Sequence, residues 1–369
     1  MKIIYFIRNS LHMYPPCLSQ ILYLDDLGQD LLVCFGSCDP TVKKILDERN
    51  IEYIDFNIQR NKNKYLGKIQ SYSLYRKKVK EVLDSKYNEK DVLWFGTADS
   101  IFFLKKIVES KRYVMSILEL YDDNDFYRKE IGKYINRAEL VIACEYMRSR
   151  IMKSWWNLDE VPTTIPNKPY THPREKHIIG STSLTKDLID QIRGKKIILY
   201  QGIISADRDL YILAKTLKQM DSDYYLVLMG QEFFDSVKII RELYPKTIYL
   251  GFVPAPLHLE ITSYANIGIA NYDDSSLNNL FCAPNKIYEY SGFDIPMLCS
   301  NVIGLENTVG DAKAGICCDF EDTKSISAGL HKIIENQKDY SANAKVFFEQ
   351  TNNLMVMEDV VTKLKKMRE

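Results

Sequence analysis

The feature that most constrains the fold of this chain is a repeated alternation of short apolar runs with segments of helical spacing. In the first half, the apolar runs lie at residues 2–7, 31–35, 53–56, 92–95, 113–118 and 140–144, and the helical patterns lie at 40–49, 68–83 and 100–109. Short apolar runs separated by helices are typical of parallel strands that are covered on both faces. The pattern therefore predicts a doubly wound α/β domain.

The alternation restarts after residues 161–169, a segment rich in proline and polar residues that we interpret as an interdomain linker. The second series places strands at residues 196–200, 225–229, 247–250, 267–270, 297–300 and 315–318, and helices at 207–219, 234–243, 257–264 and 325–334. A length of 369 residues also exceeds one typical core. We therefore expect two Rossmann-like parallel-sheet domains at residues 1–168 and 169–350, followed by a C-terminal segment at 351–369.

Composition narrows the classes of function. The 49 basic residues balance the 49 acidic ones, so no global basic field is available for nucleic acid. The eight cysteines form no C-x-x-C pair and no Cys/His cluster with zinc spacing, which predicts buried, reduced thiols. Residues 1–8 are too short for a signal peptide, and no apolar run reaches the length of a membrane span. We expect a cytoplasmic protein that is soluble or peripheral at a membrane.

The motif that carries chemistry is C-A-P-N-K-I-Y-E-Y at residues 282–290, which predicts a loop that enters a short helix. Pro284 suits the first helical turn, where its missing N–H costs nothing. The free N–H groups of that turn, together with the charge of Lys286, can hold an anion. Glu289 lies one turn further on and can accept hydrogen bonds from sugar hydroxyls. A sugar nucleotide requires an anion site for its phosphates next to an acceptor for its sugar hydroxyls. An ordinary amphipathic helix is the alternative interpretation.

This run resembles the P-N-K-x-x-E-Y donor-site motif of retaining glycosyltransferases of the GT-B fold, in glycosyltransferase family four. The resemblance covers residues 196–319 and implies that Pro284, Asn285, Lys286 and Glu289 contact a nucleoside-diphosphate sugar. It further implies two Rossmann-like domains that face each other across a cleft, with the acceptor in the first. It also implies a C-terminal helix that packs back on the first domain, and a reaction without metal ion or cofactor.

Two strand ends extend the resemblance. Gly202 follows a predicted strand and allows a ligand to approach the backbone, and Arg208 can pair with a diphosphate. This segment resembles the G-x(n)-R segment of the family, but the lysine that usually follows one turn later is absent. Phe252 and Val253 resemble the family's contacts to the nucleobase. An exposed arginine at a helix start and an ordinary strand exit are the structural alternatives.

The loop before the motif adds a further candidate and a departure. Residues 265–272 resemble the family's A-D-I-G-[IL]-x-P-Y strand, and Asn278 or Asn279 in the polar loop behind it can bind donor phosphates or sugar. A solvated loop is the alternative. The family's E-x7-E pair is incomplete, because Glu289 fits the second glutamate while Phe281 stands at the first. The contact to the transferred sugar is therefore unassigned.

The first domain matches the family only in architecture, and we expect it to hold the acceptor. The histidine that family members often carry after the fourth or fifth strand is missing. Glu119 and Asp122 follow the fifth predicted strand instead, where a carboxylate can take the proton of the acceptor hydroxyl. Asn9 and His12 follow the first strand and are candidates for the acceptor side. A charged loop and an exposed histidine are the structural alternatives.

The segment at residues 60–83 offers a surface for a partner. Its first 21 residues carry basic side chains and no acidic one, namely Arg60, Lys62, Lys64, Lys68, Arg76, Lys77, Lys78 and Lys80. Apolar residues recur there at helical spacing. The helix can lie on an anionic membrane, at about 1 kcal/mol per basic side chain, which would suit a lipid-linked acceptor. It can equally pack by its apolar stripe with a solvated basic face.

The leading hypothesis is a glycosyltransferase that moves a sugar from a nucleoside-diphosphate sugar to a glycan or lipid-linked acceptor with retention. By family analogy the setting is bacterial surface polysaccharide or glycoconjugate assembly. Two alternatives stay open. The D-x-D triplet Asp123-Asn124-Asp125 suggests a metal-dependent transferase of the GT-A type. A sugar-nucleotide binding module without turnover fits the missing histidine and glutamate, whereas nucleic-acid binding is disfavoured.

Overall fold

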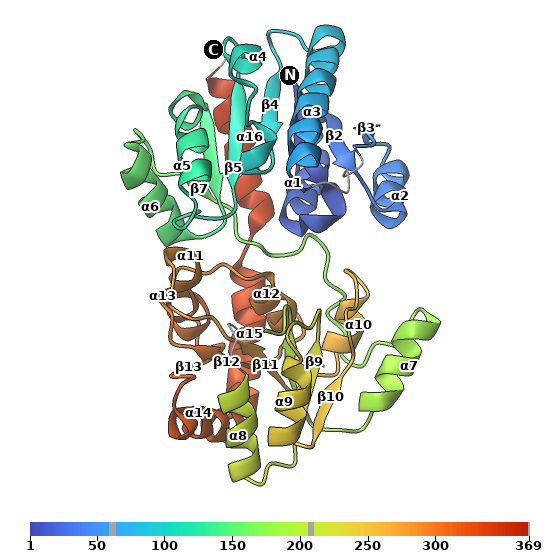
Figure 1. Cartoon of the computed structure of the whole chain (residues 1–369), viewed down its shortest axis with the longest axis vertical. Helices are drawn as coiled ribbons and strands as arrows, with labels where there is room; N and C mark the ends of the chain where they lie inside the picture. Colours follow the sequence, from blue (N-terminus) through green and yellow to red (C-terminus); the bar gives the residue numbers. More distant parts are fainter. Residues whose placement is uncertain (59–63, 206–209, 368–369) are drawn as a thin grey trace. The chain divides into compact units, whose positions relative to one another are not determined.

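The computed structural model describes residues 1–58, 64–205 and 210–367. The chain divides into two compact units (Figure 1). The first unit comprises Met1–Tyr170 together with Asn352–Glu369, and the second comprises Thr171–Thr351. The C-terminal segment thus belongs to the same unit as the N-terminus.

The strands of the first unit form a parallel sheet in the order β3-β2-β1-β4-β5-β6-β7. The strands are β1 (Lys2–Ser10), β2 (Asp30–Ser37), β3 (Glu52–Asp55), β4 (Val92–Phe95), β5 (Tyr113–Ile117), β6 (Leu140–Ala143) and β7 (Thr163–Thr164). The chain order reverses between β1 and β4, which pair from Ile3 with Val92 to Phe6 with Phe95. Ligands of such sheets bind beyond the carboxyl ends of the strands at this point of reversal.

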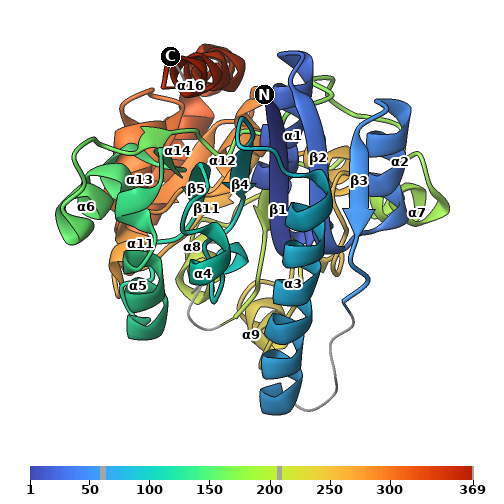
Figure 2. The same ribbon diagram turned by 90° about the horizontal axis from the view of Figure 1, so that it is seen from above.

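Helices cover both faces of this sheet. They are α1 (Pro15–Asp26), α2 (Pro40–Glu48), α3 (Lys64–Lys86), α4 (Lys105–Val108), α5 (Asp125–Gly132), α6 (Tyr146–Trp156) and α16 (Asn353–Lys366), with short helices at Leu11–Met13 (η1), Ala98–Ser100 (η2) and Ile135–Arg137 (η3). Cys17 and Ile21 of α1 share one core with Met357 and Leu364 of α16. Figure 2 shows α1 and α16 on one side of the strands and α3 on the other. The C-terminal helix therefore completes the core of the first unit.

The second unit repeats this plan, with a parallel sheet in the order β10-β9-β8-β11-β12-β13. Its strands are β8 (Ile197–Gln201), β9 (Tyr225–Met229), β10 (Thr247–Tyr249), β11 (Ile267–Ala270), β12 (Met297–Ser300) and β13 (Gly315–Cys318). The reversal here lies between β8 and β11, which are paired neighbours. By the same rule, the ends of these two strands mark the expected ligand site of the unit.

Alternate residues of each central strand face different helices. Ile197 and Leu199 of β8 lie in the core that α7 (Ser183–Ile192), α10 (His258–Thr262), α12 (Asn285–Ser291) and α15 (Gln337–Gln350) cover. Ile198 and Tyr200 lie in the opposite core, under α8 (Tyr211–Gln219), α9 (Ser236–Leu243) and α14 (Thr323–Glu335). The remaining short helices are α11 (Leu277–Leu280), α13 (Ile303–Leu305) and η5 (Glu306–Gly310). This alternation is the period-two pattern of a sheet buried on both faces.

Most predicted strands are confirmed, and two expectations are wrong in part. The helix predicted at residues 100–109 is reduced to η2 and α4, because Phe103 adopts a positive φ of 63°, which an α-helix does not allow. The proline-rich segment at 161–169 is more than a linker. It contains β7, which pairs with β6, and Ile165 beyond it is buried. Two residues of this segment pair with β6 at the edge of the sheet and place it in the first unit, whereas its composition predicts only a linker.

Candidate functional site

The candidate donor site lies at the end of β8, at the reversal point of the second unit. Gly202 follows this strand with a φ of 137°, and its N–H donates to the Met229 carbonyl oxygen at 2.9 Å. A Cβ added to Gly202 would lie 3.1 Å from Lys286 Nζ. A Cβ added to Gly230 would lie 1.7 Å from the Gly202 carbonyl oxygen. The absence of a side chain at Gly230 leaves room for the Gly202 backbone, and the absence of one at Gly202 leaves room for Lys286 Nζ.

Lys286 reaches this strand end from the first turn of α12. Pro284 is the N-cap residue of that helix, with extended backbone angles, and Asn285 is its first residue. The Lys286 side chain is buried, and its Nζ lies 4.5 Å from the centroid of the Tyr200 ring and 5.4 Å from that of Tyr272. Aromatic faces attract an ammonium group. The structure thus holds a positive charge beside Gly202.

Glu289, one turn along α12, is held by residues from two other elements. Its carboxylate accepts a hydrogen bond from Gln201 Nε2, and the other oxygen lies 3.2 Å from His258 Nε2. Gln201 is fixed in turn, because its Oε1 accepts from the Thr262 hydroxyl at 2.7 Å. Burial opposes ionisation of Glu289, but His258, Lys286 and the bond from Gln201 hold the pKa of the carboxyl below its ordinary value. Glu289 is therefore an oriented anion at neutral pH.

His258 and Gln201 are residues of this site that the sequence analysis did not select. Gln201 stands next to Gly202 at the strand end, so the end of a central strand is a signal that could have found it. His258 begins α10 and reaches Glu289 only through tertiary packing, for which the sequence pattern holds no signal. A second histidine, His172, binds the backbone of the same helix, because its Nε2 lies 3.0 Å from the Glu289 carbonyl oxygen.

The other predicted donor contacts take different positions. Phe252 is 70% exposed, whereas the Val253 side chain is buried in the core, which leaves only its backbone for a ligand. Asn279 lies on α11, and its Nδ2 donates to Asp273 Oδ1 at 2.6 Å. Arg208 falls on residues 206–209, outside the described part of the chain.

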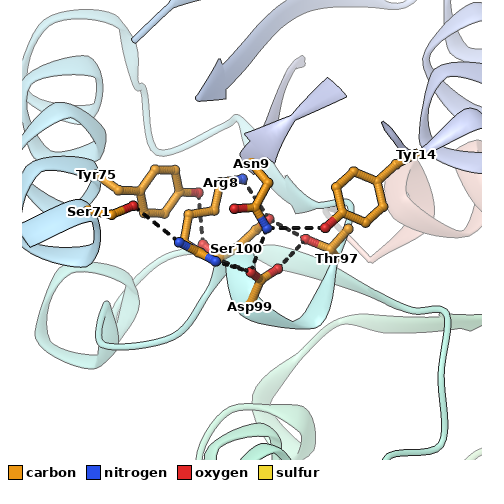
Figure 3. A network of polar contacts seen from close by, with 8 residues as sticks. All are labelled: Arg8, Asn9, Tyr14, Ser71, Tyr75, Thr97, Asp99 and Ser100. Carbon is orange, nitrogen blue, oxygen red and sulfur yellow. Dashed lines mark hydrogen bonds and ion pairs between the residues drawn. The ribbon is translucent and has the colours of Figure 1, made fainter. Parts of the chain in front are cut away.

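A second polar cluster lies at the reversal point of the first unit, at the ends of β1 and β4 (Figure 3). Arg8 of β1 donates from Nε and Nη2 to Asp99 Oδ2 at 2.9 and 2.6 Å. Both side chains are about nine-tenths buried, with exposures of 10% and 7%. Asp99 Oδ1 accepts from the Thr97 hydroxyl at 2.8 Å, and Ser71 accepts from Arg8 Nη1 at 3.3 Å. A buried ion pair contributes little to stability by itself, so this position favours a functional role.

Asn9 belongs to the same cluster. Its Nδ2 donates to Asp99 Oδ2 at 3.0 Å and to the Tyr14 hydroxyl at 3.1 Å. The sequence analysis selected Asn9 but neither Asp99 nor Tyr14. Asp99 sits in a short helix after β4, and a polar residue that follows a central strand is the signal that could have identified it.

The remaining acceptor-side candidates have structural partners. Glu119 Oε2 lies 3.2 Å from Nη1 of the buried Arg148, and the Glu119 side chain is half exposed. Asp122 follows β5 in a turn and makes contacts of its own. His12 is exposed on η1, and its Nδ1 accepts from the Asp39 backbone N–H at 3.1 Å. The arrangement brings none of these three into the hydrogen-bonded cluster around Asp99 among the contacts of the described residues.

The D-x-D triplet lies at the start of α5. Asn124 caps this helix by accepting from the Tyr127 N–H, and Asp125 is paired with Arg128. Among residues 1–58, 64–205 and 210–367, no group of three or more His, Cys, Asp or Glu side chains is placed to hold a metal ion. The triplet therefore has a local structural account as a helix start.

The helix α3 packs by the apolar stripe that its sequence predicts. Tyr72, Tyr75, Val79 and Leu83 are buried against the first unit. Arg76, Lys77 and Lys80 are exposed, as is Ile69 at 68%. Arg60 and Lys62 lie outside the described residues. No helix in the described part of the chain combines the length and apolar character needed to cross a membrane.

Solved structures match this chain along its whole length, whereas neither protein-family models nor curated protein sequences match it. HepE from Anabaena, in complex with UDP and glucose, has 14% sequence identity and a TM-score of 0.69, with 99% of this chain and 100% of HepE covered. A glycosyltransferase from Rickettsia africae has 12% identity and a TM-score of 0.70, with 100% of this chain and 99% of that chain covered. The sucrose-phosphate synthase of Thermosynechococcus elongatus has 12% identity and a TM-score of 0.67, with the same coverage.

The chain has the GT-B fold. The predicted fold class, with two Rossmann-like parallel-sheet domains, is thereby confirmed. Identities this low establish the shared architecture alone.

Proposed function

We propose that this GT-B protein is a glycosyltransferase that takes its sugar from a nucleoside-diphosphate donor and transfers it with retention. The observation that carries the proposal is the placement of Lys286 and Glu289 at the end of β8. A buried ammonium group lies beside a glycine whose backbone a diphosphate can approach, and an oriented carboxylate lies one helical turn away. HepE, which has the same fold, is known in complex with UDP-glucose and supports this choice of donor class.

The proposed chemistry divides between the donor site at the end of β8 and the carboxylates that follow β5. The bond between the anomeric carbon and the diphosphate oxygen breaks, and its electron pair leaves with the diphosphate. Lys286 stabilises the charge that develops there, and Glu289 accepts hydrogen bonds from donor hydroxyls. The acceptor oxygen bonds the same face of the anomeric carbon. Its proton passes to a carboxylate after β5, for which Glu119 and Asp122 are our candidates. By resemblance to family four, the step needs no metal ion.

The proposal is tested by nucleotide binding. Calorimetry and thermal shift with UDP, GDP, dTDP, ADP and CMP, each with and without EDTA, should show selective stabilisation by one diphosphate that EDTA does not remove. The GT-B fold rules out the GT-A-type alternative, so binding that depends on Mn²⁺ would instead contradict the metal-independent step proposed here. If no nucleotide binds the wild-type chain, the proposed donor site is wrong.

Two variants connect that binding to the site. Lys286→Ala should weaken binding of the diphosphate at least about tenfold, because a charge-assisted contact is lost. Lys215→Ala, on the exposed face of α8 in the same unit, is the matched control and should bind normally. Glu289→Gln keeps the side-chain shape but removes the charge, and should lower donor affinity or turnover. Normal kinetics in Glu289→Gln would return this residue to a purely structural role.

For the acceptor we propose a glycan or lipid-linked saccharide, as in bacterial surface polysaccharide or glycoconjugate assembly. The exposed basic face of α3 supports contact with an anionic membrane, because Arg76, Lys77 and Lys80 point away from the buried stripe. Flotation with vesicles that contain phosphatidylglycerol, compared with neutral vesicles, tests this part. A triple Arg76→Glu, Lys77→Glu, Lys80→Glu variant that still floats with anionic vesicles would contradict it.

A further inference from the structure

The hydrogen bonds around Asp99 determine which way the Asn9 amide faces. An ionised carboxylate has no proton to donate and can only accept. The atom of Asn9 that lies 3.0 Å from Asp99 Oδ2 must therefore be the amide nitrogen, and the same nitrogen donates to the Tyr14 hydroxyl at 3.1 Å. The amide oxygen, Oδ1, then faces away from both partners (Figure 3). Among the described residues, Asn9 Oδ1 has no hydrogen-bond donor.

The charge of this cluster is already balanced within the first unit. Arg8 directs Nε and Nη2 at Asp99, its Nη1 donates to Ser71, and its guanidinium carbon lies 4.1 Å from the centroid of the Tyr72 ring. The edges and a face of the guanidinium are thus occupied by protein groups. An anionic ligand gains no free cation from Arg8, and a hydroxyl donor is better matched to Asn9 Oδ1.

Aromatic side chains lie near this cluster, because the charge of Asp99 acts on Tyr14, Tyr121 and Tyr127. Tyr121 and Tyr127 stack with their ring centroids 4.5 Å apart, and Tyr127 packs edge-on against Phe102. Burial and the nearby charge of Asp99 raise the pKa of Tyr14, Tyr121 and Tyr127, so all three hydroxyls stay protonated at neutral pH. Tyr121 has a φ of 58°, a strained value for an aromatic residue that persists only where the surrounding structure imposes it. Aromatic rings around a few fixed polar groups are typical of small-molecule sites.

We propose that Asn9 Oδ1 accepts a hydrogen bond from a hydroxyl of an uncharged saccharide, and that Asp99 and Tyr14 are positioning residues that fix the Asn9 amide for it. This inference rests on the proposed function and specifies the class of the acceptor. The amide oxygen of Asn9, at the end of β1, then binds a sugar hydroxyl by accepting its hydrogen bond, and no positively charged side chain is needed. A phosphorylated sugar is not favoured at this position.

Ligand-observed NMR titration of the full chain tests this directly, with methyl glycosides of glucose, galactose, mannose and N-acetylglucosamine, and with glucose 6-phosphate. Spectra are recorded with and without UDP. We expect at least one neutral glycoside to bind, and Asn9→Ala to weaken that binding roughly tenfold, as for loss of one hydrogen bond in a desolvated site. Tyr14→Phe removes one of two anchors and should weaken it less. Asn136→Ala, an exposed asparagine of the same unit, is the matched control.

Asn9→Asp gives a readout that a merely structural role would not produce. The new carboxyl group faces Asp99, and two adjacent carboxylates hold one proton between them. When that proton is present, the O–H donates to Asp99 and the carbonyl oxygen replaces Asn9 Oδ1. At pH 8 both carboxylates are charged beside the single Arg8, so their repulsion should turn the new side chain away from Asp99 and weaken saccharide binding. Binding should recover toward pH 5, whereas the wild-type chain shows no such recovery.

Three results would overturn the proposal: no binding of any neutral glycoside, unchanged binding in Asn9→Ala, or stronger binding of glucose 6-phosphate than of the glycosides. Failure of the proposed function is a separate result. It appears as loss of nucleotide binding in the wild-type chain, which these saccharide titrations do not measure.

Discussion

Replacing Asp99 by alanine should destabilise the first unit strongly. The carboxylate receives two bonds from Arg8 Nε and Nη2, at 2.9 and 2.6 Å, in a place where both side chains are about nine-tenths buried. Without Asp99, the partners left to the guanidinium among the described residues are Ser71 and the Tyr72 ring. An uncompensated buried charge costs roughly 3–5 kcal/mol, so the free energy of unfolding should fall by about that amount.

Removing the charges of both Arg8 and Asp99 separates the cost of an uncompensated buried charge from the cost of lost packing. In an Arg8→Met, Asp99→Ala double variant no buried charge is left alone, so its loss of stability should be smaller than the sum for the two single variants. The coupling between two contacting groups of one network lies in a range of about 0.5–3 kcal/mol, and here we expect the upper end. This difference is the coupling energy between Arg8 and Asp99, which is distinct from the net contribution of the pair to stability.

Urea unfolding followed by tryptophan fluorescence measures the first unit specifically. All three tryptophans of the chain, Trp94, Trp155 and Trp156, belong to it. Asp30→Ala is the control. The Asp30 side chain is 67% exposed, and its Oδ1 lies 3.8 Å from Lys2 Nζ, so the free energy of unfolding should change by no more than about 1 kcal/mol. A loss below about 1 kcal/mol in Asp99→Ala, or a double variant that equals the sum of the singles, would refute the reasoning.

Further predictions concern the second unit. Burial lowers the pKa of His172 to about 4, so folding favours the neutral ring. The contribution of His172 to the stability of this unit should be complete above pH 6.5 and fall by roughly 3 kcal/mol toward pH 4. His172→Gln should lose less stability over this pH range, as measured by urea unfolding with circular dichroism. Gly230→Ala should lower the free energy of unfolding by about 2–4 kcal/mol, because the added Cβ meets the Gly202 carbonyl. Gly194→Ala, at a φ of 73° but with open space around it, should lower it by about 1–2 kcal/mol. Equal losses of stability in thermal unfolding would contradict this. Phe252→Ala should leave stability within about 0.5 kcal/mol but weaken nucleotide binding by about 1–3 kcal/mol in calorimetry, and an unchanged affinity would remove Phe252 from the donor site.

The sheets could be predicted from sequence because their strands are buried on both faces. Such strands appear as continuous apolar runs, and five of them, at β4, β9, β11, β12 and β13, have the bounds that the runs predict. The helix patterns were less reliable at their ends. At residues 100–109, the tight turn at Phe103 follows from tertiary packing of its ring against Tyr72 and Phe126, which local spacing does not record.

The site could be predicted only where one segment carries the chemistry. Lys286 and Glu289 lie three residues apart on one helix, so the motif itself places them together. Their partners His258 and Gln201 come from separate elements and meet only in the folded unit. The same holds for Asp99, which lies 91 positions from Arg8 in sequence. Pairings across that distance depend on the order of strands in the sheet, which apolar spacing does not specify.

The contribution of α16 to the first unit has a consequence for biosynthesis. Met357, Val360, Val361 and Leu364 complete a core whose other buried members lie before residue 171, and these four leave the ribosome only after residues 171–351. During translation the second unit is therefore complete first, while the N-terminal segment waits with one apolar face of its sheet partly uncovered. Slow synthesis would prolong that exposure. The time window for chaperone binding is set by the length of the second unit and not by that of the first.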